Sequence, residues 1–343
     1  MWTLPKTLLK VLTGAIALVA ASPFGWSSGA MAANQLSIGV IQYNAKASQG
    51  GWTSDPAYGD PLKKQIALIV DKIRDTSNPS PVQFIALEQA GTHSKNCTAN
   101  NDFLVSCALE HSGLAEWKTI LSECDFDQTQ LAYSSDWELV ATAHNPLVDG
   151  YKSLGSKDPD KCWAQAWSKG RPYNIAYFQH VKTKETVLFV IVHMPHQYPD
   201  CAGPTCPYGG KYYWDVPQFK RDVQTVVGAN VDLKKVHLIV AGDMNDLGND
   251  NDPAKFASIF GDFGNIAISQ QKKNPPDPTC CQDNGYQTFF DRIVTNSGDQ
   301  PQAEVIYLKG YDYPLDKTTD FPNGRHNEEH KAIYGEVTFP ATQ

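Results

Sequence analysis

The sequence has 343 residues, of which 41% are hydrophobic and 19% charged, and its formal net charge at pH 7 is −8. This length allows one large hydrophobic core or two modest ones. The acidic balance argues against broad, nonspecific attraction to polyanions, although a local basic groove or a bound cation would still permit a phosphate substrate.

The first 32 residues have the pattern of a secretory signal peptide. Lys6 and Lys10 precede an apolar run at 11–21, and Ala-Met-Ala at 30–32 supplies the small residues that a signal peptidase reads. We expect cleavage after residue 32 and a secreted or periplasmic protein, with an uncleaved N-terminal anchor as the alternative. No later stretch approaches the ~20 apolar residues of a membrane span, so no transmembrane segment is expected in the mature chain.

All eight cysteines lie in the expected mature part of the chain. An even number of cysteines in an exported protein favours disulfide bonds, whose pairing the sequence does not define. A zinc site is the alternative, but two of the cysteines are adjacent and no CxxC pair occurs, which argues against it. The cysteines are Cys97, Cys107, Cys124, Cys162, Cys201, Cys206, Cys280 and Cys281.

One domain is expected over residues 33–343, because no linker, repeat or low-complexity tract divides the chain. Enrichment in β-branched and aromatic residues predicts eight strands. So many strands with few helices favour an α/β fold of four layers, an α/β/β/α sandwich of two packed mixed sheets with outer helices, over one doubly wound parallel sheet. The predicted strands are 36–43, 82–88, 138–142, 173–181, 186–193, 236–242, 289–295 and 331–339.

Three helices are predicted, at 61–76, 108–123 and 215–230. The first has an apolar face at helical spacing, and Asp60-Pro61 is expected to form its N-cap and first turn. The apolar face consists of Leu62, Ile66, Ile69, Val70 and Ile73. Stretches that carry Pro and Gly predict long loops at 50–61, 196–210 and 273–286.

The most informative run is His237–Asp246, in which an apolar strand stops at Gly242 and is followed by Asp243 and Asn245. A continuous apolar strand is usually buried on both faces, so polar groups at its C-terminal end are held where solvent and ligand begin. An Asx turn that merely closes the strand is the alternative. Six predicted strands carry such side chains at an end, which favours a catalytic site: Asn44, Glu88 with Gln89, His193, Asp243 with Asn245, Asp291, and His330.

Six short motifs stand out along the chain, and five of them contain one or more of these residues. The motifs are Gln42-Tyr43-Asn44, Gly170-Arg171-Pro172, Val192-His193, Gly242-Asp243-Met244-Asn245, Phe290-Asp291-Arg292-Ile293-Val294 and Glu329-His330. In this order and spacing the chain resembles the endonuclease/exonuclease/phosphatase superfamily, the fold of pancreatic-type deoxyribonuclease, from about residue 36 to residue 339. The Phe-Asp-Arg-Ile-Val run resembles the deoxyribonuclease branch. The residues around Glu88 and Arg171 resemble the catalytic subunit of cytolethal distending toxins.

The resemblance implies that water attacks a phosphate ester in line, with help from a divalent metal. His330 would act as general acid or base, and Asp291 would hold its tautomer and stabilise the imidazolium. Asp243 and Asn245 would position the attacking water or the metal. His193 would hydrogen-bond a phosphate oxygen or share the proton transfer.

The same resemblance implies how phosphate and metal are held. Arg171 would offer a planar fork to the phosphate, which Asn44 would also contact. Asn44, Glu88 and Glu329 would hold Mg²⁺, with Mn²⁺ or Ca²⁺ as alternatives, because hard cations prefer oxygen ligands.

Two departures from the family pattern concern the expected metal ligands. The family usually reads Gln-Glu where this chain reads Glu88-Gln89, and adjacent strand residues point to opposite faces. Either a bulge turns Glu88 toward the metal, or Gln89 stands in its place and metal binding is weakened. The Ser-Asp-His of the family is Glu-Glu-His at 328–330, so the side chain of Glu329 is one methylene longer.

The predicted function is a secreted, divalent-metal-dependent phosphoesterase, a deoxyribonuclease-like endonuclease that binds nucleic acid. A phosphoinositide phosphatase or sphingomyelinase-type phosphodiesterase, which would bind a phospholipid head group, is the first alternative on the same fold. A binding protein or toxin-like subunit with weakened catalysis is the second. The aromatic residues of 196–214, directly after His193, would stack on bases, insert into a membrane or pack on the domain.

Overall fold

The computed structural model describes residues 35–45, 56–89, 97, 105–121, 129–140, 173–194, 216–274, 276–280, 289–306 and 330–340. The chain divides into two compact units, Met1–Asn34 and Gln35–Gln343, and every described residue belongs to the second. The predicted signal peptide therefore lies outside the described residues and stays a prediction. No helix in the described part of the chain is long and apolar enough to cross a membrane.

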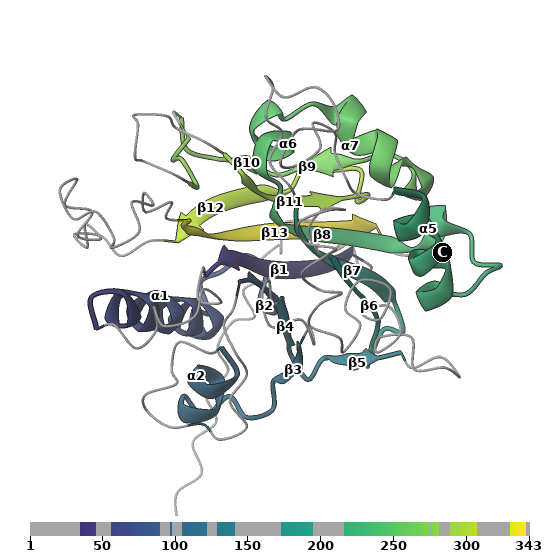
Figure 1. The fold of residues 1–343 in the computed structure, drawn as a ribbon. Coiled ribbons are helices and arrows are strands. Elements are labelled where there is room, and N and C mark those ends of the chain that lie inside the picture. The colour runs from purple at the N-terminus through teal and green to yellow at the C-terminus, as the bar shows by residue number, and fades with distance from the viewer. Residues whose placement is uncertain are drawn as a thin grey trace, which may run out of the picture. The chain divides into compact units, whose positions relative to one another are not determined.

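Two mixed sheets form the body of the second unit (Figure 1). The first runs in the order β10 (Gln270–Gln271), β12 (Gln302–Ile306), β13 (Ala332–Pro340), β1 (Gln35–Asn44), β2 (Val82–Glu88), β4 (Gln130–Tyr133), β3 (Lys118–Leu121). The second runs in the order β5 (Trp137–Leu139), β6 (Tyr173–His180), β7 (Thr186–His193), β8 (His237–Asp243), β11 (Asp291–Thr295), β9 (Ala267–Ile268). In each sheet the central pair, β1 with β2 and β7 with β8, is parallel.

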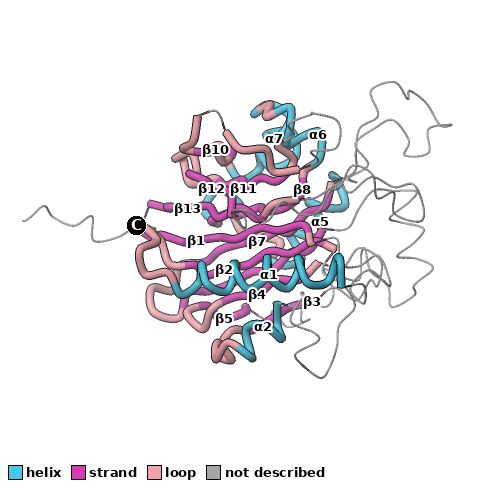
Figure 2. The backbone as a smooth tube through the Cα atoms, turned by 90° about the vertical axis from the view of Figure 1, so that its left-hand side faces the viewer, coloured by secondary structure: helices cyan, strands magenta, loops and turns pink. Residues whose placement is uncertain are grey.

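Helices cover the outer face of each sheet, which gives four layers: the two groups of helices lie on opposite sides in Figure 1, and Figure 2 looks onto the strands from one of the helical faces. Against the first sheet pack α1 (Pro56–Arg74) and α2 (Val105–His111). Against the second pack α5 (Val216–Val227) and α7 (Pro253–Phe260). Shorter helical segments are η3 (Leu233–Lys235), α6 (Asn245–Asp250) and η4 (Gly261–Phe263). The predicted α/β/β/α sandwich is confirmed.

The space between the sheets is filled by alternate residues of their central strands. Phe84 of β2 contacts Phe178 of β6 and Phe189 of β7, with ring centroids 5.1 and 4.9 Å apart. Burial of each such ring stabilises the fold by about 1.5–3 kcal/mol. This inner core holds the two sheets at a fixed spacing, and the polar ends of the same strands therefore face one another.

Seven of the eight predicted strands agree with the structure to within two residues at each end. For the eighth, predicted at 138–142, β5 covers 137–139, and residues beyond 140 lie outside the described part. The short strands β3, β4, β9, β10 and β12 were not predicted, nor were the helices α6 and α7.

The helix predicted at 108–123 is wrong beyond its first turn, because α2 spans Val105–His111 and residues 118–121 form β3. Gly113 ends the helix with a φ of 72°, and the amide of Leu114 donates to the carbonyl of Leu109 at 2.9 Å. This is a glycine-based helix C-terminus, in which the residue with positive φ is almost free of steric cost.

The helix predicted from residue 61 begins at Pro56, so the expected loop at 50–61 and the N-cap at Asp60 are wrong at this end. Proline is compatible with the first turn of a helix because the first amides have no partner within the helix. The predicted apolar face is confirmed: Leu62, Ile66, Ile69 and Val70 are buried and Ile73 packs against them.

Candidate active site

Polar side chains continue the inward-facing rows of the second sheet at the end where β7 and β8 finish. In β7, Phe189 and Ile191 belong to the inner core, and His193 is the next residue on that face. In β8, Ala241 is followed on the same face by Asp243. His193 and Asp243 are partners in the parallel register, so their side chains lie side by side.

The first sheet contributes a second polar row. Val40 of β1 belongs to the inner core, and Gln42 and Asn44 follow it on the same face. Glu88 ends β2 and is the register partner of Asn44. Because parallel strands lie about 4.8 Å apart, the Asn44 and Glu88 side chains share one edge of the inner face.

Hydrogen bonds join the two rows across the sandwich. Gln42 Nε2 donates to Glu88 Oε2 and to Asp291 Oδ1, both at 2.8 Å, and Asn44 Nδ2 donates to Asp243 Oδ2 at 3.0 Å. Gln42 is fully buried. Sequence reasoning named Gln42 within a motif but gave it no role, although its place two residues after Val40 in an alternating strand was a usable signal.

Two histidines converge on Asp243. His193 Nε2 lies 3.2 Å and His330 Nε2 3.4 Å from Asp243 Oδ2. On the other side of the His330 ring, Nδ1 lies 2.9 Å from Asp291 Oδ2. A carboxylate only accepts hydrogen bonds, so the proton on Nδ1 points to Asp291 and Nε2 is the nitrogen that can exchange a proton with other groups. All four side chains are at least 95% buried.

Glu88, and not Gln89, faces this cluster. The pairing of β1 with β2 shifts register between Gly39 and Val40, the kind of irregularity that a β-bulge produces. After the shift Glu88 pairs with Asn44, whereas Gln89 follows the strand with a φ of 49°. Of the two alternatives for this position, the one in which Gln89 takes the place of Glu88 is therefore wrong. The bulge brings the Glu88 side chain to the inner face of the sheet, whereas a strand without the bulge would have pointed it to the outer face.

The turn after β8 shapes the site. The amide of Asn245 donates to Asp243 Oδ1 at 2.9 Å, which is an Asx turn, and the second oxygen of Asp243 is the one that meets the histidines. Asn245 Nδ2 donates to the carbonyl of Met194. Gly242 is required by close approach, since a Cβ there would lie 1.9 Å from the backbone oxygen of Val192.

Three candidate elements were predicted at positions that lie outside the described residues. Arg171 and Glu329, and the aromatic segment 196–214, belong to this group, and their roles stay predictions.

Arg292, next to Asp291, donates to the backbone carbonyls of Gly248 and Ser269 at 3.0 and 3.2 Å. Its guanidinium is therefore committed to the protein backbone.

The oxygen atoms of the cluster suit a hard cation. In the described part of the chain no three or more His, Cys, Asp or Glu side chains form a ready metal cage. Amide oxygens add to the donors, however: Asn245 is fully buried, and its Oδ1 has no hydrogen-bond partner among the described residues. Mg²⁺ is commonly held by one or two carboxylates together with water, so Asn44 and Glu88, which are register partners, fit such an ion.

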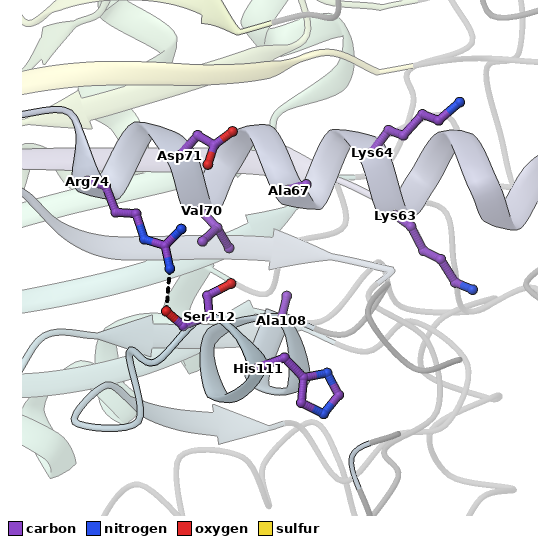
Figure 3. Close-up of a pocket in the computed structure, with 9 residues that line it drawn as sticks. All are labelled: Lys63, Lys64, Ala67, Val70, Asp71, Arg74, Ala108, His111 and Ser112. Atoms are coloured by element: carbon purple, nitrogen blue, oxygen red, sulfur yellow. Dashed lines mark hydrogen bonds between the residues drawn. The ribbon is translucent and has the colours of Figure 1, made fainter. Parts of the chain in front are cut away.

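A separate hollow of about 330 Å³ lies between α1 and α2 (Figure 3). Arg74 spans it, donating to the backbone carbonyl of Ser112. Because both helices pack on the outer face of the first sheet, this hollow is on the opposite face from the polar cluster. Its lining residues are Lys63, Lys64, Ala67, Val70, Asp71, Arg74, Ala108, His111 and Ser112.

No protein-family model and no curated protein sequence matches this chain. The chain is similar to an endonuclease/exonuclease/phosphatase family protein from Bacteroides thetaiotaomicron, with 14% identity over 89% of this chain and 96% of that one and a TM-score of 0.49. It is also similar to a mannosyl-6-phosphatase of the same organism, with 12% identity over 87% of this chain and 98% of that one and a TM-score of 0.46.

A third similar structure is that of D. rerio TDP2 complexed with a single-strand DNA product. The identity is 13% over 88% of this chain and 98% of that one, and the TM-score is 0.42. The architecture itself rests on the observed order of the strands and on the helices that cover both sheets.

Proposed function

We propose that this chain is a divalent-metal-dependent phosphoester hydrolase of the endonuclease/exonuclease/phosphatase superfamily and that it cleaves DNA as an endonuclease. The observation that supports it most directly is the buried array in which Asp291 holds His330 and both His330 and His193 meet Asp243. A histidine oriented by one carboxylate and directed toward a second is suited to moving a proton to or from a reacting oxygen.

In this proposal His330 exchanges a proton through Nε2, while Asp291 fixes Nδ1 and stabilises the charged ring. Asp243 orients the attacking water through Oδ2, the oxygen that both histidines approach. His193 donates to a phosphate oxygen. Gln42 donates a hydrogen bond to each of the Glu88 and Asp291 carboxylates and so fixes the orientation of both side chains.

Mg²⁺ or a similar cation would be held by the oxygens of Asn44 and Glu88, with the buried amide oxygen of Asn245 as a further donor near Asp243. When bound, it would neutralise charge on the phosphate as the transition state forms. Glu88 supplies the carboxylate of this set, and Asn44 lies beside it in register. Glu329 is the further ligand that the family resemblance implies.

DNA is proposed as the substrate because the run Phe290–Val294 resembles the deoxyribonuclease branch of the superfamily. Export is proposed from the N-terminal pattern of basic, apolar and small residues. We infer a disulfide bond between Cys97 and Cys107, whose sulfur atoms are in contact. Such a bond persists in an oxidising compartment, in agreement with export.

The test is nicking of supercoiled plasmid by the purified, oxidised chain with Mg²⁺ and with excess EDTA. His330→Ala is compared with His237→Ala, a matched control, because His237 is also a buried histidine with a carboxylate neighbour, Glu185, 3.4 Å away. Metal-dependent nicking that only His330→Ala abolishes supports the proposal. No nicking above the His330→Ala background, also with RNA and small phosphate esters as substrates, would reject it.

A further inference from the structure

One edge of β11 is closed by side-chain hydroxyl groups at a place where no strand of the described residues lies alongside. The amide of Asp291 donates to Thr279 Oγ1 at 3.1 Å, and the amide of Ile293 donates to Ser269 Oγ at 3.0 Å. The neighbouring strand β9 pairs with β11 only at its last two residues. Two hydroxyl groups thus accept the bonds that strand carbonyls would otherwise accept.

Unlike Ser269, Thr279 also contacts the chain segment that carries His330. Its carbonyl accepts the amide of Lys331 at 2.8 Å, and the next residue, Cys280, forms an antiparallel bridge with His330. Cys280 Sγ also lies 3.2 Å from His330 Nε2. Thr279 is therefore tied through its side chain to the backbone of Asp291 and through its carbonyl to the residue after His330.

We propose that Thr279 is a positioning residue that sets the distance between Asp291 and His330, an inference that rests on the proposed function for its effect on catalysis. The pair comes from two chain segments 39 residues apart and meets at 2.9 Å. Thr279 is 98% buried, and β-branched side chains are restricted in χ1, so its hydroxyl is held on the Asp291 amide. It thus bridges two segments that must keep their spacing to within a fraction of an ångström.

Removal of the hydroxyl should displace the pair without removing either member. Thr279→Val keeps the shape of the side chain but leaves the Asp291 amide without its acceptor. Because a misplacement of about 1 Å can cost about 100-fold in rate, kcat should fall by roughly tenfold to 100-fold. KM should change little, since the proposed phosphate and metal ligands lie elsewhere. Thr279→Ser keeps the acceptor and should recover most of kcat.

The matched control is Ser269→Ala, which removes the same kind of buried bond two residues further along β11. Hydrolysis of a small phosphodiester is measured for the three variants together with their unfolding in urea. The expected result is a similar loss of stability in Thr279→Val and Ser269→Ala, with a large loss of kcat in the first alone. Equal losses of kcat, or no recovery in Thr279→Ser, would show a merely structural role.

A second readout does not depend on activity. Nitrogen-15 NMR of the His330 ring reports which ring nitrogen carries the proton. Wild type and Ser269→Ala should show Nδ1 protonated, whereas Thr279→Val should show a mixture of tautomers. An unchanged ring spectrum in Thr279→Val would overturn the positioning role. If the spectrum changes as expected but no phosphate ester is hydrolysed by wild type, the proposed function fails while the positioning role stands.

Discussion

Asp291→Asn is the substitution whose effect the geometry defines most sharply. Both oxygens of Asp291 are committed, Oδ1 to Gln42 Nε2 and Oδ2 to His330 Nδ1. Gln42 Nε2 is a donor and requires an acceptor. In the variant, the single amide oxygen of Asn is therefore retained by Gln42, and the amide nitrogen is turned toward His330.

The consequence is the wrong tautomer. His330 Nδ1 would then accept from the Asn amide, the ring proton would move to Nε2, and Nε2 could no longer accept a proton from water. In serine proteases, the equivalent change of the triad aspartate to asparagine keeps the geometry and lowers kcat about 10⁴-fold. We expect a fall of at least about 10³-fold in kcat here, because the same two properties, tautomer and imidazolium stabilisation, are lost together.

The assay is steady-state hydrolysis of a small phosphodiester in Mg²⁺, beside thermal unfolding. Glu185→Gln is the matched control, because Glu185 lies 3.4 Å from His237 and forms a carboxylate–histidine pair that is separate from the Asp243 cluster. It should retain wild-type kcat. A kcat for Asp291→Asn within threefold of wild type, with an unchanged melting temperature, would refute the assignment of Asp291 as the group that orients His330.

Three further predictions concern stability and metal binding. Gly242→Ala should cost about 3 kcal/mol or more in urea unfolding, because the new Cβ would collide with the backbone of Val192, whereas Gly261→Ala, where the nearest atom is 3.9 Å away, should cost little. Burial holds the pKa of His237 below its usual value of 6.5, so the unfolded state takes up the proton first and stability falls as pH drops below about 6.5. His237→Gln should make the fall in melting temperature with decreasing pH less steep. An equally steep fall in the variant would contradict this prediction. Glu88→Gln should raise the Mg²⁺ concentration needed for half-maximal activity on the order of tenfold or more while the fold persists, and an unchanged requirement would exclude Glu88 as a ligand.

The sandwich could be predicted from the sequence because its central strands are long and strongly apolar. The apolar runs ending at His193 and Asp243 gave both the strands and their polar ends. Short strands at or near a sheet edge, such as β3 and β12, carry too few residues for a periodic signal, and their pairing with β4 and β13 is a property of the tertiary fold. The incorrect helix prediction beyond α2 had a local sign in the sequence. Gly113 adopts a positive φ and ends the helix, although the residues after it follow a helical pattern.

The candidate site was predicted in part for the same reason. Side chains at strand ends are visible in a sequence, but the face that each one occupies depends on the pairing. The register shift between Gly39 and Val40 decides that Glu88 points to the cluster, and no feature of the Glu88-Gln89 pair reveals it. The bridge through Gln42 likewise needs both sheets in place, since its partners Glu88 and Asp291 belong to different sheets.

The central claim, that water attacks phosphorus at this cluster, is tested most directly by isotope labelling. A DNA oligonucleotide duplex is incubated with the chain and Mg²⁺ in water enriched in oxygen-18, and the cleaved ends are analysed by mass spectrometry beside a His330→Ala reaction. The account predicts a single labelled oxygen in the terminal phosphate of each new end, with no product in the variant. Products without the label, or equal cleavage by His330→Ala, would contradict it.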